Sequence, residues 1–328
     1  MNKNWAVEKQ PNVIVMMSDD QGGADYGFAG NEIIRTPSLD KLVAEGGLLT
    51  NFYVSPVCAP TRASLMTGRY NYRTRCIDTY VGRAMMDTEE ITIAEYLREA
   101  GYQTGIYGKW HLGDNYPLRP MDQGFQKSLI HRGGGIGQPS DPFGAEGKYT
   151  DPTLIKNGVE TPMKGYCTDL YFDAAVDFIK ESVKEEKPFF AYIPPNAPHG
   201  PMIAPEKYTK RFLDLGYDKN TAGRYGMIEN IDDNFGLLMK KLDEWQAWDN
   251  TLVIFMTDNG QAGKRAKLNG EATALWTAGF KTGKGSQYEG GTHVPAFWRW
   301  KGVLGEAVLE RAQVAVGEPT FTTQMVRF

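Results

Sequence analysis

Acidic and amide side chains follow two apolar segments that lie far apart in the sequence. Asp19 and Asp20 come directly after one apolar run, and Asp258 and Asn259 come directly after another. Such runs predict strands covered on both faces, and open α/β sheets bind ligands at the carboxyl ends of their strands. A single Asp there would indicate a solvated turn, but a pair of acids favours a metal site. Because oxygen donors suit Ca²⁺ or Mg²⁺ better than Zn²⁺, we expect one hard divalent cation.

A candidate nucleophile lies in the segment 58–69, which reads Cys-Ala-Pro-Thr-Arg-Ala-Ser-Leu-Met-Thr-Gly-Arg. A Cys with Pro and Arg two and four residues later arises by chance about once in four hundred cysteines, so the short pattern alone is modest evidence. The alternative is a buried structural Cys at the start of a helix. A helix beginning within 61–66 would direct its amide N–H groups at Cys58 and would stabilise an anion there.

Basic and imidazole groups follow two further predicted strands. Lys109 and His111 come just after the short strand 103–107, and His199 lies in a loop stiffened by four prolines. Lys284 belongs to a Gly-Lys-Gly run near the end of the chain. Taken singly, a loop Lys or His is more often an ordinary surface residue than a catalytic one. Their chemistry would be to neutralise an anionic substrate and to transfer protons.

The twelve residues from Cys58 resemble the signature of the type I sulfatases, a family of the alkaline-phosphatase-like superfamily. Gly-Lys-Trp-His-Leu-Gly at 108–113 and Gly-Lys-Gly followed by Tyr-Glu-Gly-Gly at 283–291 are also similar to motifs of that family. The resemblance covers roughly residues 10–302, and its motifs come in the expected order. It implies a sulfuric ester hydrolase of the arylsulfatase type. It also implies that a separate maturation enzyme oxidises Cys58 to formylglycine.

The resemblance assigns a role to each candidate residue. The implied catalytic residues are Cys58, Arg62, Lys109, His111, His199 and Lys284. The implied ligands of one cation, Ca²⁺ rather than Mg²⁺, are Asp19, Asp20, Asp258, Asn259 and Cys58. The hydrated aldehyde would attack sulfur while Lys109 and Lys284 hold the sulfate, and Arg62 would orient the nucleophile. His199, with Lys284, would protonate the leaving alcohol, and His111 would deprotonate the second hydroxyl so that sulfate departs.

Strands and helices alternate along the chain, which predicts an α/β fold with a mixed, largely parallel central sheet flanked by helices. The resemblance implies that this is the alkaline-phosphatase-like fold. The expected strands are 13–17, 103–107, 188–193 and 251–257, with a small hairpin around 155–159. The expected helices are 39–45, capped by Ser38, then 92–100, 169–186 and 221–246. The Gly- and Pro-rich stretch 115–168 is a candidate pocket wall. Residues 10–302 would form the catalytic domain and 303–328 a short divergent tail, in place of the C-terminal subdomain usual in the family.

Composition limits the remaining possibilities. A net charge of −4 over 328 residues argues against nucleic acid as a partner, and the sequence has no apolar run of membrane-spanning length. Three widely spaced cysteines exclude a dense disulfide framework. As written the chain would be cytoplasmic, or periplasmic or secreted if a signal was removed. The substrate would be a small-molecule or carbohydrate sulfate ester. Two alternatives stay open: a phosphonate monoester or phosphodiester hydrolase using the same site, and a truncated, non-catalytic anion-binding remnant.

Overall fold

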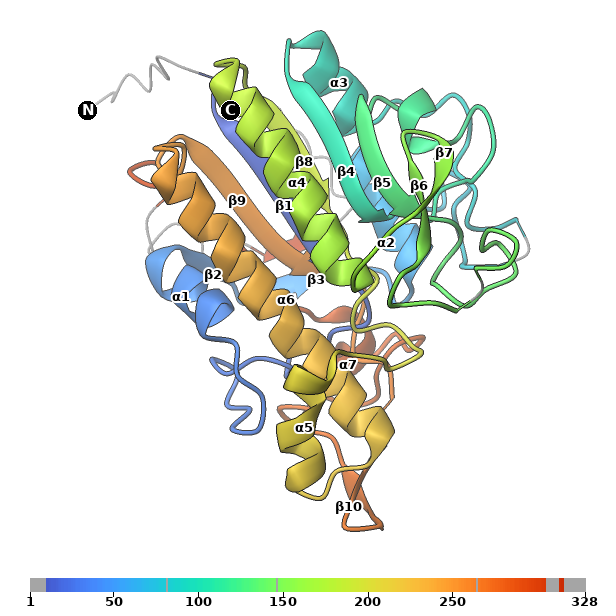
Figure 1. Cartoon of the computed structure of the whole chain (residues 1–328), viewed down its shortest axis with the longest axis vertical. Helices are drawn as coiled ribbons and strands as arrows, with labels where there is room; N and C mark the ends of the chain where they lie inside the picture. Colours follow the sequence, from blue (N-terminus) through green and yellow to red (C-terminus); the bar gives the residue numbers. More distant parts are fainter. Residues whose placement is uncertain (1–9, 81, 146, 264, 305–312, 316–328) are drawn as a thin grey trace.

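A nine-stranded sheet forms the centre of the molecule in the computed structural model, which describes residues 10–80, 82–145, 147–263, 265–304 and 313–315 (Figure 1). The strands of this sheet are β1 (Asn12–Ser18), β2 (Gly47–Leu49), β4 (Gln103–Lys109), β5 (Lys127–His131), β6 (Thr153–Lys156), β7 (Val159–Pro162), β8 (Phe189–Ile193), β9 (Thr251–Thr257) and β12 (Ala296–Arg299). Their order is β2-β12-β9-β1-β8-β4-β5-β6-β7. The five strands from β9 to β5 are parallel, and antiparallel strands flank them on both sides. The predicted mixed, largely parallel sheet is therefore confirmed.

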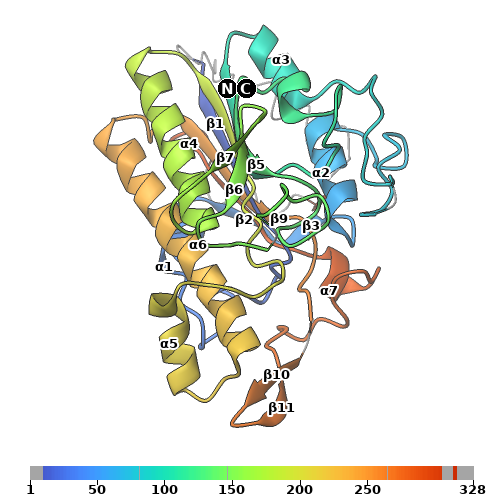
Figure 2. The same ribbon diagram turned by 45° about the vertical axis from the view of Figure 1, so that its right-hand side comes forward.

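Helices cover both faces of this sheet (Figures 1 and 2). The helices are α1 (Pro37–Glu45), α2 (Cys58–Thr67), α3 (Ile93–Glu99), α4 (Cys167–Lys184), α5 (Glu206–Asp214), α6 (Lys219–Glu244), α7 (Glu289–Thr292) and the short 3₁₀ helix η1 (Pro120–Asp122). Val13 and Val15 of β1 pack in the core under α2 and α3, whereas Ile14 and Met16 pack in the core under α1, α4 and α6. Successive strand residues point to opposite faces, so a strand buried on both sides must be apolar throughout.

Two short ribbons complete the described strands. They pair β3 (Asn51–Tyr53) with β13 (Gln313–Ala315), and β10 (Arg265–Leu268) with β11 (Glu271–Ala274). Apart from 303–304 and 313–315, the predicted tail 303–328 lies outside the described residues. None of the helices in the described part of the chain is both long and apolar enough to cross a bilayer.

Two helix starts differ from the prediction. Helix α1 begins at Pro37 and its N-cap is Thr36, not Ser38, because proline is well tolerated in the first turn, where its missing N–H has no helical partner. Helix α2 begins at Cys58 rather than within 61–66, and Pro60 occupies its first turn for the same reason. Cys58 is therefore part of the helix and does not precede it.

The remaining predicted elements are present with shifted ends. Helices α4 and α6 each begin two residues earlier than predicted, and the Asp218 side chain caps α6 by accepting the N–H groups of Asn220 and Thr221. The predicted hairpin is β6–β7, whose Asn157-Gly158 turn has positive φ at both residues, as a two-residue type I′ turn requires. Strands β2, β5 and β12 and helix α5 were not predicted, because their short sequences mix polar with apolar residues.

Candidate active site

The sheet brings the predicted site residues to one edge. Ser18 pairs with Thr257 in the parallel β1–β9 register, so the residues that follow each strand, Asp19 and Asp258, leave the sheet side by side. Lys109 ends β4, two strands away, and the loop after β8 reaches β1 through a hydrogen bond from the Asp19 N–H to the Ala197 carbonyl (3.0 Å). Parallel strands share a carboxyl edge, which explains why residues so distant in sequence meet.

The acidic residues and the cysteine form one buried cluster. Ligand atoms of Asp19, Asp20, Asp258 and Cys58 all lie within 4.8 Å of one another, and every one of these side chains is buried. Asn259 donates from Nδ2 to the Asp20 carboxylate at 2.9 Å, while its buried Oδ1 has no partner among the described residues. A buried carbonyl oxygen without a donor is unfavourable unless it coordinates something. Three carboxylates and this amide oxygen fit a hard cation.

Three basic side chains pair with the three carboxylates. Lys109 Nζ lies 2.6 Å from Asp19 Oδ2, and Lys284 Nζ lies 2.5 Å from Asp20 Oδ1. Arg62 donates to Asp258 Oδ2 from Nη2 (2.7 Å) and Nε (3.2 Å), and from Nη1 to the Lys109 carbonyl (3.0 Å). Burial raises the pKa of Asp258. The positive charges of Arg62 and Lys109 together outweigh this effect and hold the pKa below the usual carboxyl range. This charge balance permits so many ionised groups in one buried place.

Cys58 lies at the centre of this cluster. Its Sγ is 3.3 Å from Lys284 Nζ, 3.5 Å from Asp19 Oδ1 and 3.8 Å from Asp20 Oδ1. Burial, followed by the negative charges of the neighbouring carboxylates, raises the pKa of the thiol well above its ordinary value. A neutral thiol is a poor nucleophile. The surroundings therefore suit a nucleophile at this position that does not have to ionise as a thiolate.

The two predicted catalytic histidines have different surroundings. His111 follows β4 with a left-handed backbone (φ 59°), and its Nε2 donates to the Thr79 carbonyl at 3.2 Å. Within the described residues its buried Nδ1 has no partner, and burial, with the charges of Lys109 and Arg62, lowers its pKa well below the ordinary value. His199 is less buried, and its Nε2 lies 3.8 Å from Asp20 Oδ2. His111 is thus held neutral, with a free lone pair that can accept a proton.

A run of glycines separates these histidines. A Cβ placed on Gly134 would lie 2.7 Å from Cε1 of His111, and one on Gly135 would lie 3.1 Å from Nδ1 of His199. Side chains at these two positions would displace the imidazoles. The sequence indicated only a general pocket wall here, and the Gly-Gly-Gly run at 133–135 was the available signal.

His131 lies in the strand next to Lys109 and was not singled out from the sequence. It ends β5 opposite Lys109, and its Nδ1 donates to the Arg132 carbonyl at 2.9 Å. Its Nε2 is buried without a partner in the described part of the chain, and burial lowers its pKa to about 3. It was missed because strand β5 itself was not predicted.

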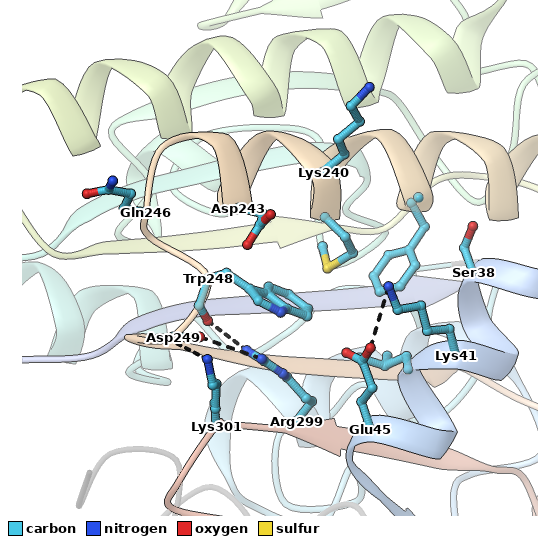
Figure 3. A pocket seen from close by; sticks show the side chains of 14 residues that line it. Ser38, Lys41, Glu45, Lys240, Asp243, Gln246, Trp248, Asp249, Arg299 and Lys301 are labelled. Carbon is cyan, nitrogen blue, oxygen red and sulfur yellow. Dashed lines mark hydrogen bonds and ion pairs between the residues drawn. The ribbon is translucent and has the colours of Figure 1, made fainter.

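A cavity away from this cluster is lined by the side chains that Figure 3 shows. It measures about 910 Å³ and is bounded by α1, α6 and the end of β12. The Arg299 guanidinium stacks over the Trp248 ring at 3.8 Å and donates to the Trp248 carbonyl at 2.7 Å. None of the predicted catalytic or metal-binding residues lines it. The charged cluster at the sheet edge is therefore separate from this cavity.

The fold and the site define an α/β protein with a buried cluster of three carboxylates, one cysteine and three basic side chains on the carboxyl edge of its sheet. A family described as Sulfatase matches residues 11–324, and the chain belongs to this family. It is 33% identical to human N-acetylgalactosamine-6-sulfatase over 317 residues, which cover 89% of this chain and 57% of that protein. It is 32% identical to human arylsulfatase A over 327 residues, or 92% of this chain and 61% of that protein. The chain thus spans about 60% of the length of these relatives.

Solved structures show the same fold. Ps i-CgsB in complex with k-i-k-neocarrahexaose superposes with a TM-score of 0.83 at 30% identity, covering 97% of this chain and 72% of that one. The phosphonate monoester hydrolase of Agrobacterium radiobacter superposes with a TM-score of 0.66 at 20% identity, covering 97% and 74%. The second likeness is one of fold alone.

Proposed function

We propose that this chain carries the catalytic centre of a sulfuric ester hydrolase of the arylsulfatase type. The observation that carries the proposal is the position of Cys58, at the start of α2, between three carboxylates and the Lys284 ammonium (3.3 Å). Membership of the sulfatase family and similarity to two human sulfatases support it. In this proposal residues 10–302 are the catalytic domain.

The nucleophile in this proposal is formylglycine made from Cys58 by a separate maturation enzyme. As a thiol, Cys58 is held neutral by burial and by the carboxylates around it. A hydrated aldehyde supplies an attacking oxygen and a second hydroxyl on the same carbon. The second hydroxyl lets sulfate leave without water having to attack an anionic ester, and this requirement explains the modification.

Asp19, Asp20, Asp258 and Asn259 would hold one hard cation, Ca²⁺ in preference to Mg²⁺, next to the side chain made from Cys58. The unpartnered Asn259 Oδ1 and the closely spaced carboxylates support this donor set. When bound, the cation would supply positive charge beside the sulfate oxygens and the attacking group.

The other residues of the chain bind the substrate and move protons. Lys109 and Lys284 would neutralise the charge of the sulfate. Arg62, which donates to Asp258 and to the Lys109 carbonyl, would keep these two residues in position. His199 would donate its Nε2 proton to the leaving oxygen as the sulfur–oxygen bond breaks. His111, neutral and with Nδ1 free, would then accept the proton of the second hydroxyl.

A carbohydrate sulfate is the substrate class that we propose. Ps i-CgsB, described in complex with a neocarrahexaose, is 30% identical to this chain. Gly134 and Gly135 let the rings of His111 and His199 pack against the backbone, so both imidazoles stay beside the cluster where a leaving alcohol would lie. Charge alone does not separate sulfate monoesters from phosphodiesters, since both are monoanionic around a tetrahedral centre.

The test is to measure hydrolysis of a nitrophenyl sulfate, a sugar sulfate and a nitrophenyl phosphodiester by protein matured at Cys58. The intact mass of the Cys58 peptide verifies maturation, because oxidation to the aldehyde lowers it. We expect the sulfate esters to be the better substrates. Faster cleavage of the phosphodiester would favour the phosphonate or phosphodiester hydrolase. A folded, matured protein without turnover would indicate the anion-binding remnant.

A further inference from the structure

The backbone of Asp20 has an unusual conformation that is fixed from both sides. Its φ is +68°, in the left-handed region that non-glycine residues seldom adopt. Its N–H donates to Asp258 Oδ1 at 3.1 Å. Its carbonyl accepts from Arg224 Nη2 at 3.0 Å and from the Ala262 N–H at 3.3 Å. Such a conformation persists only when the surrounding contacts impose it.

Arg224 belongs to a second buried ion pair, located behind this carbonyl. Its Nη2 also contacts Asp25 Oδ2 at 2.5 Å, and both side chains are almost fully buried. Asp25 further accepts from the Gly22 N–H (3.0 Å) and from Gln261 Nε2 (2.9 Å). Arg224 Nη1 lies 3.3 Å from the Ala262 carbonyl. The pair therefore connects α6 with both loops that carry the proposed cation ligands.

We infer that Arg224 and Asp25 are positioning residues for the cation site, a role that rests on the proposed function. The Asp20 side chain contacts Lys284 and Asn259 on the site, while its carbonyl is held by Arg224 on the opposite side. Releasing the carbonyl allows the Asp20 peptide to rotate and turns the carboxylate away from the site. Hydrogen-bond partners behind metal ligands commonly change metal affinity by about 10- to 100-fold.

The position of the pair argues against a purely structural role. Apart from its ion pair with Asp25, the hydrogen bonds of Arg224 go to the carbonyls of Asp20 and Ala262, each within three residues of a proposed ligand. Arg211 on α5 also forms an ion pair with a residue of α6, although this pair is less buried than Arg224 with Asp25. It contacts Glu229 and donates to the Ile33 carbonyl (2.6 Å), 13 residues from the nearest proposed ligand. Arg211→Lys therefore serves as a control for changing such a pair away from the site.

The experiment is a calcium titration, by calorimetry, of the full chain after chelation, with Arg224→Lys and Asp25→Asn compared with Arg211→Lys. We expect about 10- to 100-fold weaker Ca²⁺ binding in the first two variants and unchanged binding in the control. Excess Ca²⁺ should restore kcat in Arg224→Lys and Asp25→Asn. Circular dichroism establishes that each variant folds. Arg224→Lys keeps a positive charge opposite Asp25, which Arg224→Met would leave unpaired, whereas Asp25→Asn keeps the side-chain shape but removes the counter-charge of Arg224.

Unchanged Ca²⁺ affinity in folded Arg224→Lys and Asp25→Asn would overturn the inference, as would an equal loss in Arg211→Lys. A wild-type chain that binds neither Ca²⁺ nor Mg²⁺ would overturn it too. A wild-type chain that binds Ca²⁺ but hydrolyses no sulfate ester refutes the proposed function instead, and the titration still decides the positioning role.

Discussion

The effect of removing His199 should depend on the leaving group, whereas the effect of removing His111 should not. His199 is the more exposed of the two, and its Nε2 lies 3.8 Å from Asp20 Oδ2, beside the cluster where a leaving oxygen would lie. His111 is buried beside Lys109, its pKa is lowered well below the ordinary value, and its Nδ1 is free to accept one. We therefore expect His199→Ala to impair departure of the alcohol and His111→Ala to impair the later release of sulfate.

The size of each effect follows from the proton that is lost. General acid catalysis contributes about 10²- to 10⁴-fold, equivalent to about 3–5 kcal/mol of barrier. His199→Ala should lose about this much on a sugar sulfate, whose alkoxide needs the proton, and under about 10-fold on a nitrophenyl sulfate, which leaves readily unprotonated. His111→Ala should lower kcat similarly for all esters, because that step no longer contains the leaving group.

The assay is steady-state and burst kinetics of both variants on a series of aryl and alkyl sulfates of graded leaving-group acidity. His111→Ala should show a burst, followed by protein that carries sulfate on the Cys58 peptide, visible in its mass. Equal slopes against leaving-group acidity in both variants, with no sulfated peptide in His111→Ala, would refute the assignment of roles.

Three further predictions follow from the site. Cys58→Ala should abolish sulfate ester hydrolysis in a protein that still folds, and near wild-type turnover would exclude the covalent mechanism. Asp20→Asn should weaken Ca²⁺ binding because one ligand charge is lost, whereas Asp249→Asn in the separate cavity should leave Ca²⁺ binding unchanged. Finding two zinc ions and no calcium in active protein would contradict the assignment of a calcium site. In the folded protein His131 has a pKa of about 3 and stays neutral, but in the unfolded chain it binds a proton below about pH 6.5. The free energy of unfolding should therefore fall as the pH decreases. Between pH 7 and pH 5 the contribution of His131 to the free energy of unfolding should fall by about 2 kcal/mol, measured by urea unfolding, and this contribution should be absent in His131→Asn. Identical pH dependence in both proteins would show that His131 is not responsible.

The sequence by itself determined the strands that carry the site and the residues at their ends. The interiors of β1 and β9, residues 13–17 and 252–256, are apolar at every position because both faces of the sheet are covered. This pattern can be recognised in the sequence without knowing what the strands pack against. Their parallel pairing then required Asp19, Asp20, Asp258 and Asn259 to meet. The resemblance of the segment after Cys58 to the sulfatase signature likewise depended only on contiguous residues.

Short segments that mix polar with apolar residues show no apolar run or period from which a strand or helix could be predicted. Strand β5, Lys-Ser-Leu-Ile-His, has too few apolar residues to show a period, and its position beside β4 is fixed only by pairing. For that reason His131 was not found. Helix α2 began earlier than expected because the surrounding core, and not its sequence, decides that residues from Cys58 to Pro60 join the helix.

Which charge pairs with which was decided by the tertiary structure alone. Lys109 with Asp19, Lys284 with Asp20, and Arg62 with Asp258 join residues 90, 264 and 196 positions apart. Arg224 reads in the sequence as one more residue of an amphipathic helix, and Asp25 as a turn residue. Local sequence reports on backbone preference and burial, whereas the partner of a buried charge depends on which elements the completed sheet and its helices bring within hydrogen-bond distance.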